Sequence, residues 1–141
     1  MTMRDVLEER IRLWLADEEG SVEYAEEVEG RWAVMRQETR DATTVWFDIG
    51  ERSLSFEAYV LPEPLYPDEV HRQALVRNRR AWRCFFSLDS EHAVVLRGRL
   101  PAGSVTIEEL DRVLGEVYEM IELAFRPMLR AGFSQDAPPR S

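Results

Sequence analysis

Three residues carry the side chains best suited to metal or nucleophilic chemistry: His71, Cys84 and His92. A zinc site normally uses four ligands arranged in close pairs, and the spacings of thirteen and eight between these three residues match no such pattern. A Cys-His nucleophile pair stays open on spacing alone, because folding could join the two side chains. However, a cysteine inside an apolar strand has a raised pKa and is a poor thiolate. We therefore expect no metal site, no cofactor and no catalytic residues.

Other signals of chemistry are weak. The acidic run of Glu23, Glu26, Glu27 and Glu29 lacks the alternating Asp or Asn ligands and the glycine of a calcium loop, so a solvated strand edge explains it better. The sequence contains no G-x-G-x-x-G, P-loop, G-x-S-x-G or H-E-x-x-H motif. These observations favour a protein that is not an enzyme.

Arginines crowd the segment from 72 to 83, where Trp82 and Phe85 could add stacking surfaces for a nucleic acid. The whole chain opposes that use, because 27 acidic and 18 basic residues give a net charge of −9, which repels phosphate backbones and anionic lipids. Arginines at the end of a helix also complement its dipole. We therefore do not expect nucleic acid as a partner. The candidate anion-binding residues are Arg77, Arg79, Arg80 and Arg83.

The longest apolar pattern, from Ser104 to Phe133, predicts the helix around which the fold is organised. Thr106 and Glu109 form a capping box that starts this helix. Apolar residues then recur at spacings of three and four and form one buried stripe: Ile107, Leu110, Leu114, Val117, Ile121, Ala124, Phe125 and Met128. A second apolar line widens the surface beyond what a monomer's surface helix shows. We expect this line, Val113, Met120 and Leu123, to form the interface of a homodimer.

A hairpin is the best-specified local structure. The segments TTVWFDI and RSLSFEAYV flank Gly50-Glu51, which suits a two-residue type II′ turn and sets Phe47 opposite Leu54. One face then carries Val45, Phe47, Leu54, Phe56, Ala58 and Val60. Trp46 and Tyr59 stand on the other, mostly polar face. They form a partner-binding patch there, unless the first helix or a dimer mate covers them.

The remaining patterns complete the element order. A first amphipathic helix ends near Gly20, and two strands precede the hairpin. A middle helix starts at Pro67 and buries Val70, Ala74 and Leu75. The strand pair AWRCFFSLD and HAVVLRGRL is apolar at successive positions, as strands covered on both faces are. The length fits one domain, 1–133, followed by a disordered tail, 134–141.

The chain also resembles a known family. The segments LVRNRRAWRCFFSLD, AVVLRGRLPAGSVTIEELDRVL and VWFDIGERSLSFEAYVLPEP resemble the YbjN family, described as bacterial sensory-transduction regulators. The resemblance spans about 20 to 133. It implies an α+β fold similar to the type III secretion chaperones: an antiparallel sheet of about five strands with three helices, generally as a homodimer. It supplies no ligand, substrate or catalytic residue.

We therefore expect a non-enzymatic module that binds a protein or peptide, chaperone-like or regulatory in bacterial signalling or the stress response. The alternative is a regulator that senses an anion or other ligand through the arginine cluster. One cysteine, no leader-like start and no apolar run of about 20 residues favour a cytoplasmic protein without a membrane partner.

Overall fold

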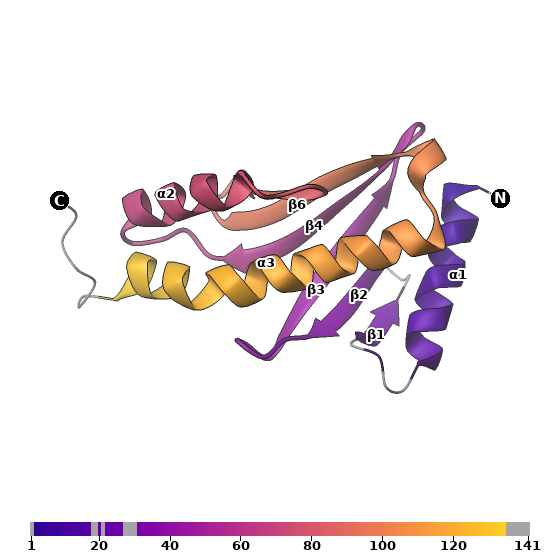
Figure 1. Ribbon diagram of the computed structural model, residues 1–141, viewed down its shortest axis with the longest axis horizontal. Coiled ribbons are helices and arrows are strands. Elements are labelled where there is room, and N and C mark those ends of the chain that lie inside the picture. The colour runs from indigo at the N-terminus through magenta and orange to yellow at the C-terminus, as the bar shows by residue number, and fades with distance from the viewer. Residues whose placement is uncertain (1, 18–19, 21, 27–30, 135–141) are drawn as a thin grey trace.

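The computed structural model describes residues 2–17, 20, 22–26 and 31–134 as an α+β fold (Figure 1). Three helices are present in this part of the chain: α1 (Met3–Ala16), α2 (Pro67–Asn78) and α3 (Ile107–Phe133). The strands are β1 (Val22–Glu26), β2 (Arg31–Arg36), β3 (Ala42–Ile49), β4 (Ser53–Leu61), β5 (Cys84–Leu88) and β6 (Val94–Pro101). They form one antiparallel sheet in the order β1-β2-β3-β4-β6-β5. The predicted fold class is confirmed, with one strand more than the five that the resemblance implied.

All three helices pack on the same side of the sheet. In Figure 1, α3 runs along the sheet, α1 lies across one end, and α2 lies beside the other end of α3. Each helix contributes to a single buried cluster, which α1 enters through Leu7, Ile11 and Trp14. The indole of Trp14 stacks on the ring of Phe47 at a centroid distance of 6.3 Å. One face of the sheet is therefore the floor of the core.

Helix α3 follows the predicted stripe closely. Its N-cap is Thr106, whose hydroxyl accepts a hydrogen bond from the backbone amide of Glu109 at 3.1 Å. The stripe residues from Leu110 to Met128 are buried, apart from the partly buried Phe125. The second half of the predicted capping box is absent, because the Glu109 carboxylate binds Arg83 and Arg112 instead of reaching back to the N-cap. Two guanidinium groups outcompete one backbone amide for that carboxylate.

The β3–β4 hairpin turns one residue later than predicted. The amide of Gly50 donates to the carbonyl of Ser53, so Glu51 and Arg52 are the two turn residues. Neither Gly50 nor Glu51 has the positive φ that a type II′ turn requires. The register is therefore Phe47 opposite Phe56, a shift of two positions. Because side chains alternate with a period of two, this shift leaves every residue on its predicted face.

Helix α2 is oriented slightly differently from the prediction. Val70 is buried and Ala74 packs against the core, as expected, but the Leu75 side chain is 70% exposed. Successive residues of a helix differ by about 100° around its axis. The inner side is centred between Val70 and Ala74, with Arg77 close to it, so Leu75 points away from α3.

Several sequence predictions fall on residues outside this description. The tail lies there from residue 135 onward, while Ser134 is the C-cap of α3. The acidic run lies there as well: positions 27 and 29 are outside the described residues, and the side chains of positions 23 and 26 are not described. None of the described helices is both long enough and apolar enough to cross a membrane.

Candidate partner-binding face

The open face is the side of the sheet opposite the core, and it includes both aromatic residues singled out from the sequence. Trp46 on β3 is 45% exposed and Tyr59 on β4 is 49% exposed. Helix α1 was one candidate cover for these rings, but its buried residues Leu7, Ile11 and Trp14 belong to the core on the other side. In the described protomer both rings therefore reach solvent.

Strand register adds a third ring to the open face. Trp46 pairs with Glu57, Glu57 with Arg97, and Arg97 with Phe85, in a line across four strands. Phe85 is 44% exposed, whereas its neighbours Cys84 and Phe86 are buried. The line thus has an aromatic ring at each end and a Glu57–Arg97 ion pair of 3.6 Å between them.

The prediction that the last strand pair is covered on both faces is wrong for β5. Burial alternates at Cys84, Phe85 and Phe86, because the helices pack on the core face and Phe85 lies on the opposite, open face. An uninterrupted apolar run hid this alternation in the sequence. On β6, Val94, Val95 and Leu96 are all buried, so the prediction holds there.

Tyr59 stands on a fixed section of backbone. The guanidinium of Arg40 donates to the carbonyls of Tyr59 at 2.7 Å and Val60 at 2.8 Å, and it lies 4.9 Å from the ring centroid of Phe125. Burial lowers the pKa of Arg40. Partial burial, followed by the charges of Asp89 and Glu91, raises the pKa of the Tyr59 hydroxyl. Tyr59 therefore stays protonated and can donate a hydrogen bond to a partner.

The free edge of β5 is already occupied by side chains. The amide of Asn78 donates to the carbonyl of Phe86 at 3.1 Å and accepts from its backbone N–H at 2.7 Å, as a neighbouring strand would. The next outward amide along the edge, that of Cys84, donates to Glu116 at 2.8 Å. An edge satisfied in this way is closed to a further strand at these positions. A partner must therefore use a face of the molecule rather than this edge.

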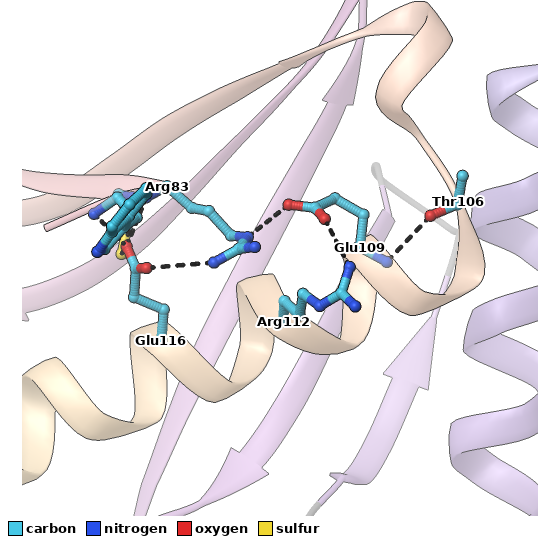
Figure 2. A network of polar contacts seen from close by, with 7 residues as sticks. Arg83, Thr106, Glu109, Arg112 and Glu116 are labelled. Atoms are coloured by element: carbon cyan, nitrogen blue, oxygen red, sulfur yellow. Dashed lines mark hydrogen bonds and ion pairs between the residues drawn. The ribbon is translucent and has the colours of Figure 1, made fainter.

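Glu116 ties the loop before β5 to helix α3 (Figure 2). One oxygen of its carboxylate accepts from the backbone amides of Trp82, Arg83 and Cys84 at 3.3, 2.7 and 2.8 Å. Its second oxygen lies 3.6 Å from the guanidinium of Arg83, which also binds Glu109. One feature of the sequence indicates this role: Glu116 is next to the apolar position 117 and three residues after the apolar position 113, so its side chain lies at the margin of the buried helix face.

The four candidate anion-binding arginines differ in their exposure and in their hydrogen-bond and ion-pair partners. Arg83 is held by Glu109 and Glu116, and the Glu109 hydrogen bond is the main reason that the pKa of Arg83 is raised. The Nε of Arg77 is buried on the inner side of α2 without a partner in the described chain. Arg79 and Arg80 are exposed, and their side chains form no ion pair with any described residue. An anion approaching from solvent therefore meets Arg79 and Arg80 first.

The three residues of the predicted dimer line differ in how deeply they are buried. Val113 is fully buried in the core, and Met120 packs against the core with its sulfur 3.5 Å from Cys84 Sγ. Leu123 is 67% exposed. The homodimer stays a prediction, and of these three residues Leu123 is the exposed one.

The three residues suited to metal or nucleophilic chemistry lie on separate elements. His71 is on α2, Cys84 is buried at the start of β5, and His92 is in the β5–β6 turn with a φ of 64°. Burial, reinforced by the nearby Glu116 carboxylate, raises the pKa of the Cys84 thiol far above its ordinary value. No group of three His, Cys, Asp or Glu residues within the described part of the chain could hold a metal ion.

A cavity of about 300 Å³ lies between α1, the first strands and α3. Its principal polar group is the Asp111 carboxylate, which accepts from the indole of Trp14 at 2.9 Å and from the guanidinium of Arg10 at 2.8 Å. Leu114, Met35 and Tyr118 supply much of the remaining wall. The three polar side chains of Arg10, Trp14 and Asp111 bind one another, so they fasten α1 to α3.

Comparisons with known proteins match most of the chain. The model of the YbjN family, described as "Putative bacterial sensory transduction regulator", matches residues 8–130. The uncharacterized protein ML2442 of Mycobacterium leprae is 40% identical over 97 residues, which are 68% of this chain and 53% of that protein. Rv0487 of Mycobacterium tuberculosis is 36% identical over 86 residues, or 60% of this chain and 47% of that protein. The chain thus spans about half the length of the curated relatives it matches.

Solved structures agree on the fold. A chain of the ExsC–ExsE complex has a TM-score of 0.63 at 17% identity and covers 91% of this chain and 97% of its own length. A chain from the structure of the Yersinia pestis type III secretion chaperone SycH, solved with a stable fragment of YscM2, has a TM-score of 0.58 at 17% identity, with coverages of 87% and 99%. At such identities the likeness shows the fold alone, and that fold is the one implied by the sequence resemblance.

Proposed function

This chain belongs to the YbjN family, and we propose that it is a non-enzymatic, cytoplasmic module that holds a protein or peptide partner on the open face of its sheet. Its role would be chaperone-like or regulatory in bacterial signalling or the stress response. The observation that carries the proposal is the exposure of Trp46, Tyr59 and Phe85 on one uncovered face. Large rings lose little rotamer freedom on binding and bury much apolar area, so they serve as anchors.

The surroundings of these rings favour a partner that lies across the strands. The Glu57–Arg97 ion pair sits between Trp46 and Phe85 in the same cross-strand line, and it offers polar contacts between two apolar anchors. Strand addition at the outer edge of β5 is opposed by Asn78 and Glu116, which already bind its backbone. The partner would therefore recognise side chains on the face rather than unpaired backbone groups.

We propose in addition that the protein forms a homodimer, with the exposed Leu123 on α3 among the contacts. An isologous pair would cover this apolar residue on both copies at once. Light scattering at micromolar and higher concentrations measures the oligomeric state directly. A dimer that Leu123→Glu converts to a monomer supports this interface, whereas a monomeric wild-type protein rejects the proposal.

Affinity capture from a native lysate tests the binding proposal. The wild-type protein is compared with Trp46→Ala and Tyr59→Ala, and with Leu15→Ala, which truncates an exposed apolar residue on α1. We expect a co-purifying protein to be reduced by both sheet variants and retained by Leu15→Ala. Native mass spectrometry of the same samples addresses the alternative. A retained small anion that disappears in an Arg79→Glu, Arg80→Glu variant, without any protein partner, would favour the anion-sensing regulator.

A further inference from the structure

A second exposed apolar surface lies on the outer side of α2 and in the loop that follows it. Leu75 is 70% exposed, Val76 is 51% exposed and Trp82 is 84% exposed. Arg79 and Arg80 lie between them in the sequence and are exposed as well. We call these five residues the α2 patch. Scattered apolar residues are ordinary on protein surfaces, but a nearly fully exposed tryptophan, two exposed aliphatic side chains and two exposed arginines within one segment, 75–82, are a concentrated set of anchor residues.

The backbone beneath Trp82 is rigidly held. Glu116 of α3 accepts hydrogen bonds from three successive amides that begin at Trp82, and Figure 2 shows how this carboxylate reaches the loop. On the α2 side, the amide of Ala81 donates to the carbonyl of Asn78 at 3.2 Å. Folding has therefore already ordered the backbone that carries the indole. A partner that covers Trp82 would have little loop entropy left to lose, which is what makes a pre-organised anchor effective.

The charge of the patch is also available to a partner. Arg83 is neutralised by Glu109 and Glu116, and Arg72 pairs with Glu69 at 3.3 Å. Arg79 and Arg80, in contrast, form no ion pair with any described residue. They are therefore two exposed cations on a chain whose net charge is −9.

We propose that the α2 patch is a docking site for an acidic amphipathic segment of a partner protein. Carboxylates of that segment would bind Arg79 and Arg80, while its apolar side chains cover Trp82 and Leu75. Guanidinium groups bind carboxylates through paired hydrogen bonds, and an adjacent indole face adds apolar area. This inference does not rest on the open face, because the two surfaces share no residue.

Two other occupants fit the patch less well. A second copy that docked through the same surface would form an isologous contact, which brings the two basic patches of a symmetric pair together and opposes association. A nucleic acid would need several phosphate contacts, yet the patch offers two unpaired arginines on a strongly acidic chain. Both occupants would give results that the following experiment distinguishes.

A random peptide display library, selected against the immobilised 141-residue chain, tests the proposal. We expect enrichment of peptides that combine Asp or Glu with large apolar residues. Fluorescently labelled copies of the enriched peptides are then titrated into the wild-type protein and its variants. We expect Trp82→Ala, and separately the double variant Arg79→Glu, Arg80→Glu, to weaken binding on the order of tenfold or more, and added salt to weaken it as well. Leu15→Ala and Arg52→Glu, at exposed positions outside both the α2 patch and the open face, are controls and should bind normally. Trp46→Ala is titrated as well, because it reports binding at the open face.

Several results would overturn the proposal. If the enriched peptides contain no excess of Asp or Glu, the proposed pairing of carboxylates with Arg79 and Arg80 is contradicted. If peptide binding is lost in Trp46→Ala but kept in Trp82→Ala, the site lies on the open face. That second outcome would leave the proposed function standing, so the two failures are distinguishable. Conversion of a dimer to a monomer by Arg79→Glu, Arg80→Glu would assign the patch to a second copy. Binding of a labelled single-stranded oligonucleotide that both patch variants abolish would assign it to nucleic acid.

Discussion

Trp46 and Phe47 are neighbours on β3, and their surroundings differ as the two faces of the sheet do. Phe47 is 4% exposed and lies under Trp14 of α1. Trp46 is 45% exposed on the opposite face of the same strand. Both residues lie on the same strand, so their exposure differs because the helices pack against only one face of the sheet. The core face is closed by apolar side chains, whereas the open face keeps its large rings at the surface.

The core side is also fastened by carboxylates that bind backbone amides. Two carboxylates of α3 hold loops through backbone amides: Glu116 binds the loop before β5, and Glu122 accepts from the amide of Glu38 at 2.6 Å. A carboxylate that accepts several amides satisfies backbone groups that burial would otherwise leave unpaired. The comparison predicts that mutations on the core side reduce stability, while mutations on the open face reduce binding.

The neighbouring aromatic residues of β3 give the largest expected contrast. Phe47→Ala should lower the free energy of unfolding by about 3–5 kcal/mol, because it leaves a cavity in a packed core. Trp46→Ala should lower it by less than about 1 kcal/mol, because its side chain already contacts water. Urea unfolding followed by circular dichroism measures both. Equal losses for the two variants would show that the open face is covered in solution.

Removal of a polar tie should have the next largest effect. Glu116→Ala leaves three backbone amides and the Arg83 guanidinium without their acceptor, and we expect a loss of about 2–3 kcal/mol. Glu119→Ala removes an exposed glutamate one turn along the same helix and should change stability by less than about 0.5 kcal/mol. Similar unfolding midpoints for the two variants would mean that water replaces Glu116 at little cost.

Two glycines extend the comparison to packing. A Cβ at Gly98 would lie 2.1 Å from the carbonyl oxygen of Arg83 and 2.3 Å from Cζ of Phe56, so Gly98→Ala should cost about 1–3 kcal/mol. A Cβ at Gly115 meets no atom within 4 Å, and alanine there should stabilise α3 by about 0.5–1 kcal/mol. Thermal unfolding of the pair should therefore show shifts of opposite sign. A stable Gly98→Ala protein would contradict the close approach of β6 to the Arg83 carbonyl.

The smallest effect concerns pH. The hydrogen bond from Arg83 is the main cause that lowers the pKa of Glu109 in the folded state. In the unfolded chain this carboxylate has its ordinary pKa of about 4.3, so between that pH and the lower folded-state pKa the unfolded chain binds more protons than the folded one. The stability that the ionised Glu109 contributes is therefore present at neutral pH and is lost as the pH falls through its folded-state pKa. Glu109→Gln should show a shallower loss of stability on acidification than the wild type. Urea midpoints at neutral and acidic pH test this, with the exposed Glu108→Gln as control, and parallel curves for all three proteins would contradict it.

The sequence was most informative where a single periodicity decided the structure. The stripe from Leu110 to Met128 and the alternation around Phe47 both followed from spacing. The hairpin turn was misplaced by one residue. The pairing of β4 with β6, which the hydrogen bond from the Ala102 amide to the Arg52 carbonyl extends beyond the ends of the two strands, also influences where the chain turns. Turn preference alone contains no information about that third strand.

The candidate site was only partly predictable for the same reason. Trp46 and Tyr59 followed from alternation within one hairpin, but the exposure of Phe85 depends on the register of β5 with β6 and on which face the helices cover, which are properties of the whole fold. Arg83 looked equivalent to Arg79 and Arg80 in sequence. Only the approach of α3, with Glu109 and Glu116, distinguishes it, and contacts between distant segments leave no local pattern.

Site-specific photo-crosslinking in living cells tests the central claim most directly. A benzoylphenylalanine at position 59 replaces one exposed ring of the open face by another, and the same probe at the exposed position 119 on α3 is the matched control. We predict an adduct with a different protein at position 59 and none at position 119. No adduct at position 59, or an adduct there only with a second copy of this chain, would contradict the claim that the open face holds a protein partner.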